Sequence, residues 1–157
     1  DSLLKMSGLL DGRMYGAGTL DERMKRRSIY FMIKRSRLIP TMQLFDSPEP
    51  LVSQGSRPST IIAPQALHFM NNGQVREAAV ALAGRFEKKI EDEGAISLAY
   101  QTVVGREPTQ AETKSITAFM NAQADSYKAA GRNDARKLAL ADLSQVLFGL
   151  NEFIYVN

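Results

Sequence analysis

The sequence contains no cysteine and only one histidine among its 157 residues. The absence of cysteine excludes a disulfide framework, a thiolate metal site, a cysteine nucleophile and covalent c-type haem attachment within this chain. With His68 alone, neither a multi-histidine metal centre nor a histidine proton relay is expected. No apolar run approaches the roughly 18 residues that a membrane-spanning helix needs. The sequence therefore predicts no metal, no cofactor held by this chain and no membrane span.

Charge of neither sign dominates, but the cations are unevenly placed. Hydrophobic residues make up 44% of the chain and charged residues 24%, and the net charge is +3. Residues 1–40 hold nine Lys/Arg and four Asp/Glu, a net charge of +5, whereas residues 41–157 hold eleven and thirteen, a net charge of −2. This composition is that of an ordinary globular protein, so we expect one domain over residues 1–157.

The first residues are Asp-Ser-Leu-Leu, without an initiator methionine and without the charged and apolar segments of a signal peptide. They resemble the inside of a structural element. We expect the chain to be a C-terminal fragment of a longer domain.

Residues 61–157 are predicted to be helical because their apolar residues recur three or four positions apart. Pro64 suits the first turn of a helix, and residues 71–73, Asn-Asn-Gly, interrupt it. After residue 73, four sets of apolar residues each form one apolar stripe along a predicted helix. They are Val75, Ala79, Leu82, Phe86 and Ile90; Ile96, Ala99, Tyr100 and Val103; Ile116, Phe119, Met120 and Tyr127; and Leu140, Leu143, Leu147 and Leu150.

Several residues mark where these helices begin and end. Thr109 and Glu112 have the spacing of a capping box, and Asp134 is a candidate cap for the last long helix. Gly105 and Gly131 are suited to left-handed helix ends. We therefore expect a mainly α, helical bundle-like domain.

Residues 1–60 are predicted to form a small irregular or two-stranded β part. A short helix near the start should end either at Gly8 or at the Asp11-Gly12 pair, and Thr19 with Glu22 has the spacing of another capping box. The apolar, β-branched run at residues 29–33 favours a buried strand over a helical turn, and residues 41–45 could pair with it as an antiparallel partner. Two Pro-containing segments make residues 46–60 a loop.

That loop and the helix after it hold the candidate ligand-binding residues, namely Asp46, Glu49, Arg57, Ser59, Thr60, Gln65 and Asn71. If Asp46 orients Arg57 and a loop hydroxyl meets the Gln65 amide, a polar cleft for a carbohydrate or another small polar ligand results. Asp46 with Glu49 could also act as an acid and base or bind a hard cation. The alternative, which we favour, is that these groups cap the helix and satisfy the loop backbone.

A basic segment at residues 25–37 offers a second interpretation. Its cations, with Tyr30 or Phe31 stacking on bases, could bind nucleic acid. We expect instead that charged strand ends remain in water, because the aromatic residues lie in an apolar run and the rest of the chain is net acidic.

Several short sequence segments, taken together and in order, resemble a C-terminal domain of unknown function in large secreted planctomycete-type proteins. They are Ser-Gly-Leu-Leu-Asp at 7–11, Arg-Arg-Ser-Ile-Tyr at 26–30, Lys-Arg-Ser at 34–36, Phe-Asp-Ser-Pro-Glu at 45–49, Arg57, Ser59 and Thr60, Pro-Gln-Ala-Leu at 64–67, Asn71 and Asn72, Gly-Arg-Glu-Pro-Thr at 105–109, Asp-Leu-Ser-Gln-Val-Leu at 142–147, and Asn-Glu-Phe-Ile-Tyr-Val at 151–156. The chain departs from that family at Glu49 and Asn72, where the family has aspartate.

The resemblance implies an extracytoplasmic location and places any haem in a neighbouring cytochrome-c-like domain. We therefore expect a non-catalytic helical module that packs on a neighbouring domain of the same protein and binds a ligand through the 46–60 loop. The alternative is that the chain contributes to a redox or hydrolytic, polysaccharide-related enzyme site completed by a neighbouring domain.

Overall fold

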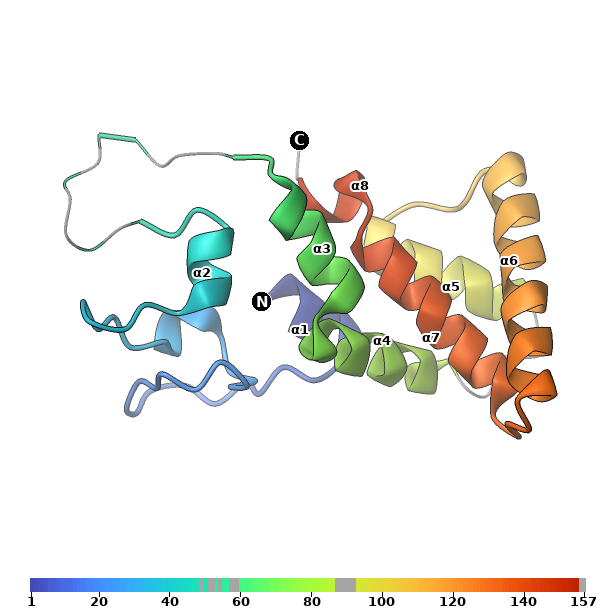
Figure 1. Ribbon diagram of the computed structural model, residues 1–157, viewed down its shortest axis with the longest axis horizontal. Helices are drawn as coiled ribbons and strands as arrows, with labels where there is room; N and C mark the ends of the chain where they lie inside the picture. The colour runs from blue at the N-terminus through green and yellow to red at the C-terminus, as the bar shows by residue number, and fades with distance from the viewer. Residues whose placement is uncertain (49, 51–52, 54, 57–59, 87–92, 156–157) are drawn as a thin grey trace.

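The computed structural model describes residues 1–48, 50, 53, 55–56, 60–86 and 93–155. Its helices lie along an elongated molecule, with the irregular chain and α2 at one end and the bundle at the other (Figure 1). The elements are α1 (Ser2–Ser7), a 3₁₀ turn (Ser28–Tyr30), α2 (Pro40–Leu44), α3 (Ala63–Asn71), α4 (Gly73–Arg85), α5 (Glu93–Val104), α6 (Gln110–Ala129), α7 (Ala135–Phe148) and α8 (Asn151–Ile154). The prediction of a mainly α, bundle-like domain is confirmed.

The core forms around α7, which packs against α3, α4, α5, α6 and α8. Leu140, Leu147 and Phe148 from this helix are almost completely buried. Leu82 of α4 and Met120 of α6 reach the same core, and it is lined elsewhere by alanines that let the helices approach closely. The apolar stripes of the predicted helices therefore pack against one another in this core, as their spacing predicts. Ile90 of the first stripe lies outside the described residues.

Three of the four residues predicted to mark the ends of the later helices do so as expected, counting Thr109 with Glu112 as one. The Thr109 hydroxyl accepts a hydrogen bond from the Glu112 backbone N–H, and the Glu112 carboxylate accepts one from the Thr109 N–H. Gly105 and Gly131 adopt φ of 80° and 75°, the left-handed conformation that glycine allows without strain. Asp134 precedes α7, but its carboxylate pairs with Arg132 at 3.0 Å rather than capping the helix.

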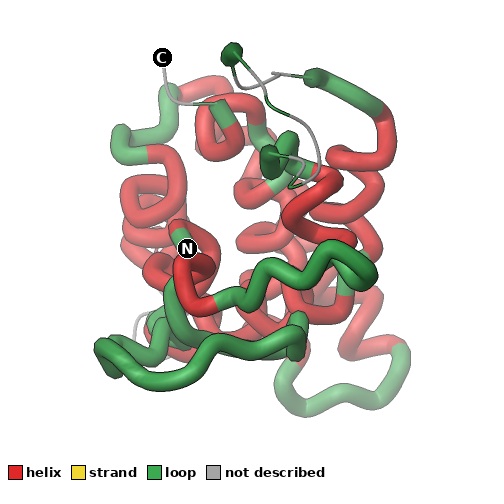
Figure 2. Tube along the Cα trace, turned by 90° about the vertical axis from the view of Figure 1, so that its left-hand side faces the viewer, coloured by secondary structure: helices red, strands yellow, loops and turns green. Residues whose placement is uncertain are grey.

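The first part of the chain is irregular, which is one of the two arrangements predicted for it, and its described residues form no two-stranded ribbon. The described residues contain only isolated bridges, such as the one between Thr19 and Phe31, and loops dominate this end of the molecule (Figure 2). Residues 29–30 belong to a 3₁₀ turn. The proposed second strand is α2, because Pro40 at the first helical position favours a helix. Thr19 and Glu22 start no helix; the Thr19 hydroxyl instead accepts from the Asp21 N–H.

Polar contacts tie this irregular part to the bundle. The Gln74 amide of α4 donates to the Glu22 carbonyl at 2.9 Å, and Lys25 forms an ion pair with Glu77. The short helix α1 packs on α4 and ends at Gly8 in a left-handed conformation, the first of the two predicted ends. These contacts hold residues 1–45 beside α4.

Candidate functional site

Two of the seven candidate ligand-binding residues bind each other. Asp46 has a left-handed backbone, with φ of 58°, and its carboxylate accepts hydrogen bonds from the N–H and the hydroxyl of Thr60 at 2.7 and 2.8 Å. Asn71 is exposed at the end of α3. Glu49, Arg57 and Ser59 lie outside the described residues. The contact between Asp46 and Thr60 closes the two ends of the 46–60 loop.

Gln65 is the buried member of the candidate set, with 5% of its surface exposed. Its side-chain N–H donates to the Leu44 carbonyl at the end of α2, at 2.9 Å, and its side-chain oxygen accepts from the Ile62 N–H. The amide therefore joins α2 to α3 and does not meet Thr60. Asp46 and Gln65 therefore satisfy backbone groups at the two ends of the loop, as residues that anchor a loop do.

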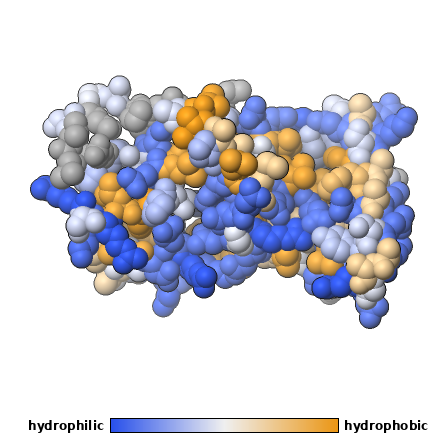
Figure 3. Space-filling view, viewed as in Figure 1, coloured by the Kyte–Doolittle hydropathy of each residue, from blue (hydrophilic) through white to orange (hydrophobic). Residues whose placement is uncertain are grey.

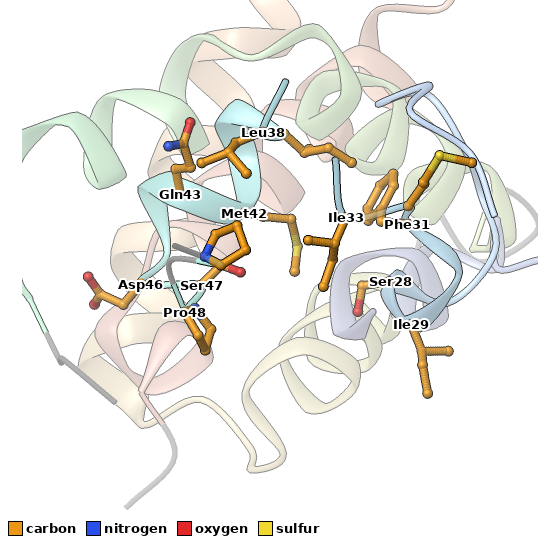
Figure 4. Close-up of a pocket in the computed structure, with 13 residues that line it drawn as sticks. Ser28, Ile29, Phe31, Ile33, Leu38, Met42, Gln43, Asp46, Ser47 and Pro48 are labelled. Atoms are coloured by element: carbon orange, nitrogen blue, oxygen red, sulfur yellow. The ribbon is translucent and has the colours of Figure 1, made fainter. Parts of the chain in front are cut away.

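A cleft of about 630 Å³ lies beside Asp46, between α2 and residues 28–38. Phe31, Ile33 and Met42 face one another across it, while the Asp46 carboxylate points away from its edge (Figure 4). Leu38 and Ile39 also line it. The sequence does not predict this cleft, because a buried strand was expected at residues 29–33, whereas Ile33 is 78% exposed.

The basic segment divides into two halves. In the first, Lys25 pairs with Glu77, the Arg26 guanidinium lies 3.6 Å from the centre of the Tyr30 ring, and Arg27 pairs with Asp1 at 3.4 Å. Tyr30 also accepts a hydrogen bond from the backbone of the 13–15 loop through its hydroxyl. These cations and this aromatic ring therefore have partners within the molecule.

The second half of the basic segment is a solvent-exposed turn. Lys34, Arg35 and Arg37 are all exposed, and none has an ion-pair partner in the part of the chain that the structure describes. The Arg37 N–H donates to the Lys34 carbonyl at 2.9 Å and closes the turn. Ile33 and Leu38, which flank the turn in sequence, both line the cleft. Cations without an ion-pair partner among the described residues thus lie next to the apolar part of the cleft.

His68 lies in an aromatic cluster rather than in a proton relay. Its ring stands edge-on to Phe45 at 5.7 Å and to Phe69 at 5.9 Å between centroids. Burial lowers the pKa of His68 from its usual value, because burial disfavours the charged ring. This cluster packs α3 against the end of α2.

The strongest charged network lies in the bundle, far along the chain from the 46–60 loop. Arg106 bonds to the carboxylates of Glu112 and Glu152, each at 2.9 Å, and its guanidinium lies 5.1 Å from the centre of the Tyr100 ring. The hydrogen bonds from Arg106 and Tyr100 lower the pKa of Glu112, whereas burial and the nearby Glu112 carboxylate raise the pKa of Tyr100 to about 12. The network joins α5, α6 and α8.

No group of three or more His, Asp or Glu side chains among the described residues is close enough to hold a metal ion. No described helix is both long and apolar enough to span a bilayer.

Residues 1–120 match the family model of PSD1, a protein of unknown function (DUF1553). The chain belongs to this family. The matched region of this DUF1553 chain includes the cleft, the 46–60 loop and the helices up to Met120. No curated protein and no solved structure is significantly similar to it.

Proposed function

We propose that this DUF1553 chain is a non-catalytic helical module of a larger extracytoplasmic protein and that it packs on a neighbouring domain through the outer face of α3. The observation that supports the contact is that α3 is apolar on two sides. Phe69 packs towards the core, whereas Leu67 and Met70 are 53% and 66% exposed. A helix that is apolar all round is normally buried on all sides.

The exposed face of α3 is continuous with further apolar surface. Ile61 and Ile62 precede the helix and are 80% and 45% exposed, and apolar side chains gather at this place on the molecular surface (Figure 3). Val146 of α7 is 53% exposed, and the neighbouring Gln145 side chain donates to the Met70 carbonyl at 2.7 Å. We call Ile61, Ile62, Leu67, Met70 and Val146 the α3 face.

The α3 face lacks charge as well as polarity. The sequence from residue 58 to residue 75 contains no Asp, Glu, Lys or Arg. Permanent interfaces are more apolar than transient ones and are depleted of charge at their centre. An uncharged face favours a permanent contact within one protein, which is why we assign its occupant as a neighbouring domain of the same polypeptide.

The resemblance to planctomycete-type secreted proteins supports the extracytoplasmic location and a cytochrome-c-like domain as a further part of the protein. It also supports placing any haem in that domain, outside this cysteine-free chain. Binding of a carbohydrate or another small polar ligand through the 46–60 loop is part of the same proposal, and Asp46 and Ser47, which line the cleft, support it. The alternative is that the chain contributes to a redox or hydrolytic, polysaccharide-related enzyme site completed by a neighbouring domain.

Hydrogen exchange tests the packing proposal. The amides of α3 should exchange more slowly in the full-length protein than in the isolated 157-residue chain, because a neighbouring domain covers them. The double substitution Leu67→Lys with Met70→Lys should abolish this difference, whereas Val80→Lys on the exposed surface of α4 should preserve it. Equal exchange of α3 in both proteins would contradict the proposal.

A further inference from the structure

We propose that the cleft between α2 and residues 28–38 binds an extended acidic segment of a partner polypeptide. The bound segment places apolar side chains in the cleft and carboxylates on the turn formed by Lys34, Arg35 and Arg37. This surface is separate from the α3 face, so the inference does not depend on how α3 is covered.

The first support is the shape and chemistry of the cleft. Its volume of about 630 Å³ is within the range of ligand pockets. Apolar side chains such as Phe31, Ile33 and Met42 line the cleft beside polar ones such as Ser28 and Gln43, and Ile29, also in the lining, is 76% exposed. Large apolar side chains exposed together mark a surface that another molecule covers.

The second support is the charge at the rim. The cations of residues 25–27 already have partners within the molecule, since Lys25 and Arg27 form ion pairs and Arg26 stacks on Tyr30. The three cations of residues 34–37 have no ion-pair partner among the described residues. Charge complementarity then selects a negatively charged partner. Asp46, on the opposite wall, already accepts two hydrogen bonds from Thr60, so the carboxylates of the partner belong on the basic turn.

The third support is the backbone of residues 33–38, which favours a peptide over other anionic ligands. Between residues 33 and 38, the backbone pairing in the described part of the chain is confined to the bridge between Lys34 and Arg37. Irregular backbone with free donors and acceptors can pair with an extended peptide, which a lipid headgroup cannot reproduce along its length. Nucleic acid fits less well, because three cations in a single turn do not follow a phosphate backbone and Tyr30 is already stacked under Arg26.

Selection from a random decapeptide display library tests the inference, because it requires no knowledge of the natural partner. Peptides retained by the 157-residue chain should be enriched in Asp and Glu interleaved with Val, Ile or Leu. The best peptide should bind the variant carrying Arg35→Glu and Arg37→Glu at least about tenfold more weakly. Lys5→Glu with Lys114→Glu, two exposed cations elsewhere, is the matched control and should bind like the unaltered chain.

Each remaining outcome counts against the inference. Selected peptides without acidic enrichment, or an acidic peptide that binds the Arg35→Glu, Arg37→Glu variant undiminished, would overturn it. Replacing the aliphatic residues of the peptide by serine should abolish binding, so retained binding would show that charge alone acts. Binding of phosphatidylserine vesicles or a single-stranded oligonucleotide in preference to the selected peptides would assign the surface to a membrane or to nucleic acid.

Discussion

The two parts of this molecule are held together by different kinds of contact. From α3 onwards, helices share one core in which residues such as Leu140 and Phe148 have no exposed surface. Residues 8–39 form isolated bridges and a 3₁₀ turn, fixed by side chains that bond to backbone, and they leave residues such as Ile29 and Ile33 in solvent. Stability is therefore concentrated in the helical part, and the surfaces suited to binding lie in the irregular part and on α3 next to it.

The difference has a simple physical origin. A helix satisfies its own backbone and needs only one apolar stripe to join a core. The irregular part has short apolar runs separated by glycines and cations, so its backbone depends on partners such as the Tyr30 hydroxyl. Surfaces that expose apolar groups and unpaired charges to water add little to stability, and they are common at functional sites.

The largest effect is expected for a truncation in the core of the helical part. Leu140→Ala should lower the free energy of unfolding by about 2–5 kcal/mol, because it removes a completely buried side chain and leaves a cavity. Ile33→Ala, in the irregular part, should change it by less than about 0.5 kcal/mol, since that side chain is 78% exposed. Urea unfolding followed by circular dichroism measures both. Similar losses for the two variants would remove the contrast between the two parts.

An intermediate effect is expected where the two parts meet. Gln65→Ala should cost about 1–3 kcal/mol, because it leaves the Leu44 carbonyl without its hydrogen bond. Gln43→Ala is the matched control, as Gln43 is exposed on α2. Hydrogen exchange should show faster exchange in α2 while α4 and α7 keep their protection. If α2 is unaffected and ligand binding is lost instead, Gln65 belongs to a binding site rather than to the α2–α3 contact.

The helical part could be predicted from the sequence because its signals are local. Apolar spacing, the Thr109–Glu112 capping box and the left-handed glycines all act within a few residues. The irregular part could not be predicted in the same way. The apolar run at 29–33 suits a strand only if a partner strand exists, and Pro40 makes the proposed partner a helix.

The candidate site shows the same limit. Asp46 and Gln65 are polar residues of the type that binds ligands, but only their three-dimensional partners, Thr60 and the Leu44 carbonyl, reveal that they bond within the fold. The two halves of the basic segment have similar composition. They differ because Asp1 and Glu77, remote in sequence, lie beside the first half only.

The smallest effect expected near neutral pH concerns the charged network of the bundle. Arg106 and Glu112 have side chains 39% and 33% exposed, so solvent screens their attraction. The pKa of Glu112 nevertheless lies well below its ordinary value of 4.5, mainly because Arg106 and Tyr100 donate to its carboxylate. A lowered pKa stabilises the fold above the unfolded value, and this contribution is lost as the pH falls towards the folded value.

Thermal unfolding at several pH values checks this prediction. The Tm of the unaltered chain should fall from about pH 5 to about pH 3, and Glu112→Gln should fall less over the same interval. Asp11→Asn is the matched control in the irregular part, where Arg13 lowers the pKa of the Asp11 carboxyl. Because Asp11 lies outside the cooperative core, its replacement should leave the acid dependence of the Tm unchanged. A flattening in Asp11→Asn as large as in Glu112→Gln would mean that the irregular part unfolds together with the bundle, and that the two parts differ in contacts but not in cooperativity.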